Sequence, residues 1–129
     1  MEYLADTVAV IRHFAKCGHI GKRAKAILEG GDRGENVICI SVMSIAEIMY
    51  LAERNRIPLN LSAIRTNLAK LDNYKIINLD FDIVEVASGI GKLELHDRLI
   101  AASAKYLGIP ILTSDEDIKK AGVIDVIWD

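Results

Sequence analysis

Four acidic residues of this chain stand where a carboxylate can take part in metal chemistry. Each follows an apolar strand pattern or lies near the start of a helical pattern: Asp6, Glu47, Asp97 and Asp115. In an α/β domain such positions can meet, because ligands bind beyond the carboxyl ends of the strands. Carboxylates gathered at one point repel one another and resist ionisation unless a cation lies among them. The pattern therefore predicts a site for a divalent metal ion.

Each acid also has a purely structural explanation. Asp6 and Asp115 can be helix N-caps, and Asp97 can stabilise the positive end of its helix. Glu47 follows Ser44 at the spacing of a capping box. However, four separate caps need not share one edge of a sheet. Asp97 also lies on the apolar face of its helix, where a carboxylate needs a partner. Taken together, the four acids favour a site.

The donor type indicates which ion and which reaction to expect. Ligands that are oxygen atoms alone favour Mg²⁺ or Mn²⁺ over zinc or a redox metal. Such an ion lowers the pKa of a bound water and neutralises charge that develops on a phosphoryl group. The sequence therefore predicts metal-assisted hydrolysis of phosphodiester bonds by water, without a covalent side-chain nucleophile.

Three other candidate motifs fail on spacing. Residues 18–22 resemble a phosphate-binding loop, but the glycines are too close and no Ser or Thr follows the lysine. His13, Cys17 and His19 have no second pair of zinc ligands. The glycines of 89–91 follow a helical pattern rather than a strand, which excludes a dinucleotide fingerprint.

The elements that must position the acids alternate between strands and helices. Gly30-Gly31 is expected to end the second helix, and Ser41 or Ser44 is expected to cap the third, which runs to about Asn55. Asp80 is expected to cap a later helix. This alternation predicts an α/β fold, a three-layer α/β/α sandwich with a central, mainly parallel sheet. Strands are predicted at 3–5, 37–40, 75–79, 111–113 and 123–128, and helices at about 8–14, 22–29, 44–55, 62–71, 83–87, 96–107 and 116–121.

Length and composition are consistent with one domain, residues 1–129, with 51% apolar residues. No stretch is long and apolar enough to span a membrane, and no signal peptide is recognisable, so we expect a cytoplasmic protein. A net charge of −2 does not by itself indicate a nucleic-acid partner. Acidic residues are nevertheless absent between Thr7 and Leu28, a window that is either a solvated helical face or a basic rim beside an acidic site. The basic residues of this window are Arg12, Lys16, Lys22, Arg23 and Lys25.

The segments around the acids resemble the PIN domain, a metal-dependent ribonuclease fold, and among its members the VapC-type toxins. The resemblance rests on residues 4–7, 41–48, 97–104 and 112–117, and it covers essentially the whole chain. It implies that Asp6 and Asp97 are the principal ligands of Mg²⁺ or Mn²⁺. It also implies that Glu47 and Asp115 complete the shell, directly or through water.

The same resemblance implies supporting residues and partners. The hydroxyls of Thr7 and Thr113 match positions that support such sites by hydrogen bonds, and Asp117 is a possible fifth acid. The implied substrate is RNA, and the implied partners are a small inhibitory antitoxin and a second copy of the chain. Two alternatives stay open at this point: an RNA-processing nuclease without an antitoxin, and a non-catalytic binding module whose acids are only caps.

Overall fold

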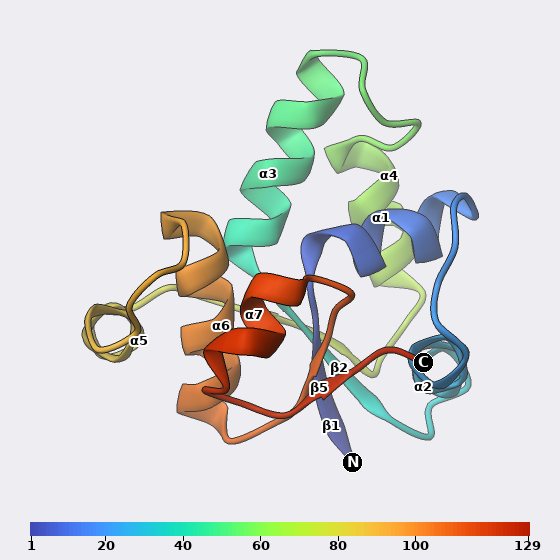
Figure 1. Ribbon diagram of the computed structural model, residues 1–129. Coiled ribbons are helices and arrows are strands. Elements are labelled where there is room, and N and C mark those ends of the chain that lie inside the picture. Colours follow the sequence, from blue (N-terminus) through green and yellow to red (C-terminus); the bar gives the residue numbers. More distant parts are fainter.

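A five-stranded parallel sheet forms the centre of the computed structural model, which describes residues 1–129 (Figure 1). The sheet order is β3-β2-β1-β4-β5, and every pairing is parallel, which confirms the predicted fold class. The closing strand is shorter than predicted, because it pairs only with the two residues of β4. The strands are β1 (Glu2–Ala5), β2 (Val37–Ser41), β3 (Tyr74–Ile77), β4 (Ile111–Leu112) and β5 (Val126–Ile127).

Helices cover both faces of the sheet. Successive strand residues point to opposite faces, so they pack against different helices. The helices are α1 (Thr7–Ala15), α2 (Lys22–Asp32), α3 (Val42–Glu53), α4 (Leu61–Ala69), α5 (Phe81–Ser88), α6 (Leu95–Leu107) and α7 (Glu116–Ala121). Leu4 and Cys39 pack with α6 and α7 in one buried cluster, whereas Ala5 and Ile40 pack with α1, α2, α3 and α4 in another. The sheet is therefore the middle of three layers.

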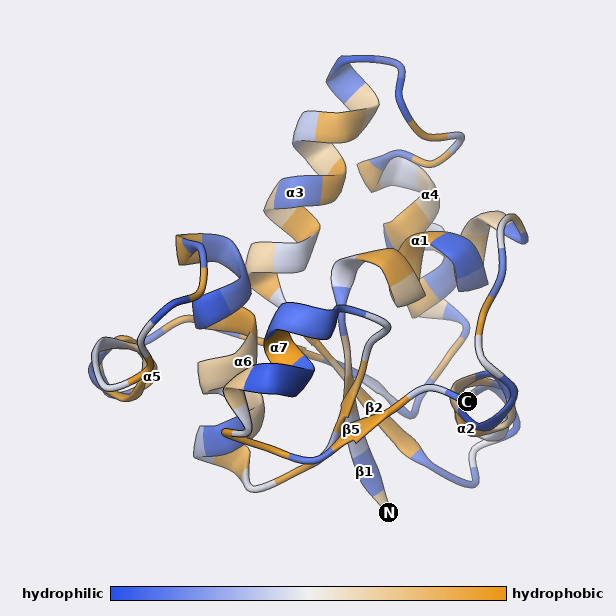
Figure 2. Cartoon of the chain, in the orientation of Figure 1, coloured by the Kyte–Doolittle hydropathy of each residue, from blue (hydrophilic) through white to orange (hydrophobic).

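Hydropathy follows these layers. Figure 2 shows apolar residues along β2 and β5, and polar residues at the far end of α3 and in the turn after it. Helix α5 packs against α6 in a third buried cluster, which Ile77 at the end of β3 also contacts. No helix combines the length and apolar character that crossing a bilayer requires. Both cysteines are free thiols, and Cys39 is buried as expected.

The predicted end of the second helix is wrong. Helix α2 runs through Gly30 and Gly31 and ends at Asp32. A Cβ on Gly30 would lie 2.5 Å from the Asn36 side-chain nitrogen, and one on Gly31 would lie 2.5 Å from Cγ1 of Ile38. Gly31 therefore allows α2 to approach β2 closely, and Gly30 makes room for the Asn36 side chain just before β2, rather than ending the helix.

Strand order places β1 in the middle of the sheet. From β1 the chain moves outward to β2 and β3, and then returns to β4 on the other side of β1. The direction of winding thus reverses between β1 and β4. In open parallel sheets such a switch point leaves a crevice beyond the carboxyl ends of the two strands, and ligands bind there.

Candidate active site

The switch point brings two of the predicted acids together. Asp6 directly follows β1, and Asp115 lies three residues beyond the end of β4, which pairs with β1. Helix α3 supplies Glu47 in its second turn, and α6 supplies Asp97 in its first turn. Helix α3 packs against both α1 and α6. The acids lie close enough for Asp115 and Asp97 to act electrostatically on Asp6, and for Asp115 and Glu47 to act on Asp97.

Asp6 is the most buried acid of the set, with 8% of its surface exposed. Its Oδ1 accepts a hydrogen bond from the Ala9 backbone N–H at 2.8 Å, which makes it the N-cap of α1. Its Oδ2 accepts a short hydrogen bond from the Thr113 hydroxyl. Burial raises the pKa of Asp6 to about 6, with smaller contributions in the same direction from the charges of Asp115 and Asp97. Asp6 is therefore a helix cap, as the structural explanation predicted. It is also a carboxyl group with a raised pKa at the switch point.

Thr113 connects the two strand ends. Its side chain is fully buried, and besides donating to Asp6 its oxygen accepts from the Asp115 backbone N–H at 3.0 Å. Asp115 in turn caps α7, accepting from the backbone N–H groups of Asp117 at 2.8 Å and Ile118 at 3.0 Å. The Asp117 side chain is exposed on α7, and only its backbone takes part in this network.

Glu47 is not part of a capping box. Ser41 caps α3 by accepting from the Met43 backbone N–H at 3.1 Å. Glu47 instead accepts from the Thr7 hydroxyl, with 2.6 Å between Oε1 and Oγ1. The Thr7 and Ser44 hydroxyls lie 2.9 Å apart in the buried contact between α1 and α3. Ser44 is therefore a residue that orients Thr7, a role that its spacing from Glu47 did not reveal.

The Asp97 side chain is half-buried and makes no hydrogen bond to another residue of the chain. Burial raises its pKa, and the charges of Asp115, Glu47 and Glu94 act in the same direction, while His96 opposes them. The His96 Nδ1 lies 3.6 Å from Glu47 Oε2, and it is the one basic group that pairs with any of the four acids. The site thus gathers negative charge that the chain does not neutralise.

As the side chains lie in this structure, no three His, Cys, Asp or Glu residues form a ready-made ligand set. Three of the acids direct an oxygen toward a protein donor instead. The donor chemistry still fits a hard divalent cation, because the charges of neighbouring carboxylates help to raise the pKa of Asp6 and Asp97, and the four acids offer oxygen ligands. Binding an ion would require some of these oxygens to turn from protein donors toward it.

The predicted basic rim lies elsewhere. Lys16 is the C-cap of α1, ten residues from Asp6, or about 15 Å along the helix. Arg12 donates from Nη1 to the backbone oxygen of His19 at 2.7 Å. Lys22 and Arg23 are exposed in the first turn of α2. None of these basic residues pairs with one of the four acids.

Comparison with known proteins gives one family. The family model described as "PIN domain" matches residues 3–124. No curated protein sequence matches the chain significantly.

Solved structures of similar shape are known from bacteria. VapBC2 from Rickettsia felis, bound to a DNA fragment from its promoter, is 18% identical, with a TM-score of 0.72 and 100% of both chains covered. DNA-bound VapBC from Salmonella typhimurium is 17% identical, with a TM-score of 0.71 and 98% and 97% covered. A toxin–antitoxin complex from Klebsiella pneumoniae is 27% identical, with a TM-score of 0.65 and 97% and 95% covered. The Rickettsia felis and Salmonella typhimurium proteins are similar to this chain in fold only.

Proposed function

The chain belongs to the PIN domain family, and we propose that it is a metal-dependent endoribonuclease that acts as the toxin of a toxin–antitoxin pair. One observation carries the proposal: Asp6, Glu47, Asp97 and Asp115 share the switch-point edge of the sheet, and no Lys or Arg of the chain pairs with any of them. Structural caps alone do not account for this arrangement, because the Asp97 carboxylate is half-buried without a hydrogen-bond partner.

In this proposal Asp6 and Asp97 are the principal ligands of Mg²⁺ or Mn²⁺, and Glu47 and Asp115 complete the shell. When bound, the ion supplies charge neutralisation for the phosphoryl group and acidifies a water. The rest of the chemistry belongs to the chain. The Thr113 hydroxyl holds the Asp6 carboxylate, and the Thr7 hydroxyl holds Glu47. With the pKa of Asp6 at about 6, this group is mostly ionised and ready to bind a cation near neutral pH.

The proposed partners follow from the same family relationship. The similar structures named above are of VapBC proteins and of a toxin–antitoxin complex, which supports a small antitoxin that covers the acidic edge. A homodimer is also proposed. Large apolar side chains exposed on α3 and α5, such as Tyr50 at 51% and Phe81 at 76%, offer surface for a second copy. We place the activity in the cytoplasm, where RNA is available.

The direct test is cleavage of RNA by the purified protein, with Asp117→Asn as the control for Asp97→Asn. Both changes remove one carboxylate from the same end of the molecule, but only Asp97 lies within the charged site. Wild type and Asp117→Asn should cleave in Mg²⁺ and stop with a chelator. Asp97→Asn should lose about 10³-fold in rate, equivalent to roughly 4 kcal/mol. Equal cleavage by Asp97→Asn would contradict the proposal.

Expression in bacteria separates the toxin from an RNA-processing nuclease. A toxin should arrest growth, and coexpression of the protein encoded beside it should restore growth. An RNA-processing nuclease should do neither. A non-catalytic module should show no cleavage and no stabilisation by Mg²⁺.

A further inference from the structure

The end of α1 opposite the acids borders a cavity of about 620 Å³. Its walls come from the last turn of α1, the loop 16–20, α2 and the end of α4. This volume lies within the range of pockets that bind small molecules or parts of larger ligands. Figure 1 shows this loop descending from α1 to α2, on the side of the molecule away from α5 and α6.

Positive charge dominates the cavity wall. Four side chains that carry a full positive charge line it, and none of them forms an ion pair with a carboxylate of the chain. Three of the four belong to the basic window of the sequence, and Lys70 lies outside it, whereas Lys22 and Arg23 do not line the cavity. The cationic set is Arg12, Lys16, Lys25 and Lys70, facing two carboxylates, Glu29 and Asp32.

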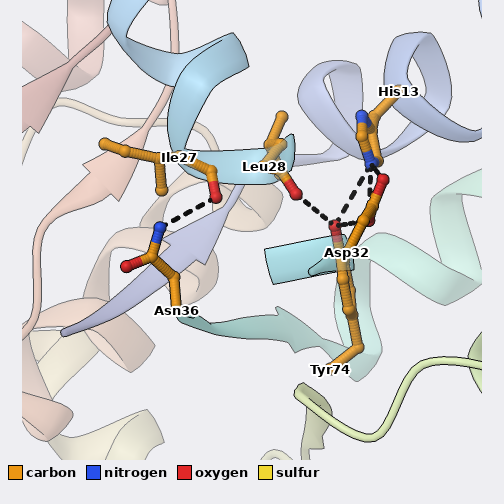
Figure 3. A network of polar contacts seen from close by, with 6 residues as sticks. All are labelled: His13, Ile27, Leu28, Asp32, Asn36 and Tyr74. Carbon is orange, nitrogen blue, oxygen red and sulfur yellow. Dashed lines mark hydrogen bonds and ion pairs between the residues drawn. The ribbon is translucent and has the colours of Figure 1, made fainter. Parts of the chain in front are cut away.

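One of the two carboxylates is already engaged by neutral and basic donors. Asp32 lies 3.0 Å from Nε2 of His13 and accepts from the Tyr74 hydroxyl at 2.8 Å (Figure 3). The Tyr74 hydroxyl oxygen also lies 3.1 Å from the backbone oxygen of Leu28. The network ties α1, α2 and β3 together, so that wall of the cavity is held in place. Glu29 is then the one carboxylate in the cavity without a basic partner.

We propose that this cavity binds phosphates of a single-stranded RNA whose scissile bond lies at the acidic edge. The proposal rests on the ribonuclease function proposed above. Unpaired Lys and Arg side chains bind phosphodiester backbones irrespective of base sequence. The two ends of α1 are about 15 Å apart, which corresponds to four or five stacked nucleotides at about 3.4 Å each. One RNA strand is therefore long enough to contact both, which a free nucleotide is not.

Binding of a fluorescent twelve-nucleotide RNA, measured by anisotropy in a chelator, tests the cavity without relying on cleavage. The double variant Lys16→Gln, Lys70→Gln should bind about tenfold more weakly, and the slope of log Kd against log salt should fall by about 1.4. The matched control Lys75→Gln, Lys105→Gln removes the same charge from exposed positions that do not line the cavity. Glu29→Gln should act in the opposite direction and bind more tightly.

Cleavage of substrates of two lengths then locates the effect. The double variant should raise the KM for the twelve-nucleotide RNA several-fold and leave cleavage of a dinucleotide unchanged. If wild type cleaves neither RNA, the proposed ribonuclease function is wrong. The anisotropy measurement still tests RNA binding by the cavity independently.

Three results would overturn the cavity assignment. One is equal RNA affinity for the double variant and its control. Another is binding of AMP alone as tightly as the twelve-nucleotide RNA, which would assign a free-nucleotide site. The third is a double variant that loses affinity for polyglutamate but not for RNA, which would assign a site for an acidic peptide.

Discussion

The two ends of α1 differ in both charge and burial. At the N-terminus of α1, Asp6 is buried and hydrogen-bonded. At the C-terminus, Lys16 is exposed and Arg12 is only partly buried. Both charges complement the helix dipole, so the dipole explains their signs at either end. It does not explain the burial of Asp6, which raises its pKa. We therefore expect ionisation of Asp6 to lower the free energy of unfolding, and the exposed charge of Lys16 to have little effect on it.

The largest expected effect is a pH dependence of stability that comes from Asp6. Its pKa is raised from 3.8 to about 6 in the folded state, so folding is favoured below pH 4 and this advantage is lost as pH rises through 6. The contribution is about 3 kcal/mol. The free energy of unfolding, measured with urea, should depend on pH differently in wild type and in Asp6→Asn between about pH 4 and 7. Parallel curves would show that Asp6 ionises normally.

Binding of a divalent metal ion should restore the stability that the fold loses when Asp6 ionises. At a concentration a hundredfold above Kd, Mg²⁺ or Mn²⁺ should stabilise the fold by about 2.7 kcal/mol at neutral pH. The effect should shrink near pH 5, where Asp6 is largely protonated. Thermal unfolding with and without the ion measures it. Asp97→Asn should lose the stabilisation and Lys16→Gln should keep it, whereas loss in both would remove the distinction between the two ends.

Removal of the Thr113 hydroxyl should have a smaller effect at the acidic end. Thr113→Val deletes the donor to Asp6 and the acceptor of the Asp115 N–H, at a cost of about 1–2 kcal/mol. Because the Thr113 hydrogen bond lowers the pKa of Asp6, the variant should move the midpoint of the pH dependence upward. Urea unfolding across the same pH range gives both values. Thr7→Val, which affects Glu47 instead, should leave that midpoint in place.

The smallest expected stability effect is at the basic end. Lys16→Gln changes an exposed side chain without an ion-pair partner, so its free energy of unfolding should stay within about 0.5 kcal/mol of wild type. Weaker RNA binding in the same variant would show that this end contributes to binding rather than to folding. A loss of several kcal/mol would instead show that the Lys16 side chain contributes to folding.

Much of the local structure could be predicted from the sequence, because its signals lie within a few residues. The alternation of strands and helices predicted the parallel sheet, and Asp6, Asp80 and Asp115 are N-caps as considered. Local signals were misleading at Gly30 and Gly31. Glycine permits both a helix end and a close helix–strand contact, and only the position of β2 distinguishes them.

The sequence by itself determined which residues are the candidates for the proposed chemistry: a set of carboxylates near element ends, and a basic window free of acids. Only the tertiary structure decided which of them meet. Strand order is a non-local property, and it places β1 beside β4, so that Thr113 can join Asp6 to Asp115 across more than a hundred residues. The same packing adds Lys70 from α4 to a cavity whose other cations belong to the first two helices and the loop between them. Spacing along the chain cannot predict such pairs, because the contacts form only when separate helices and strands pack together.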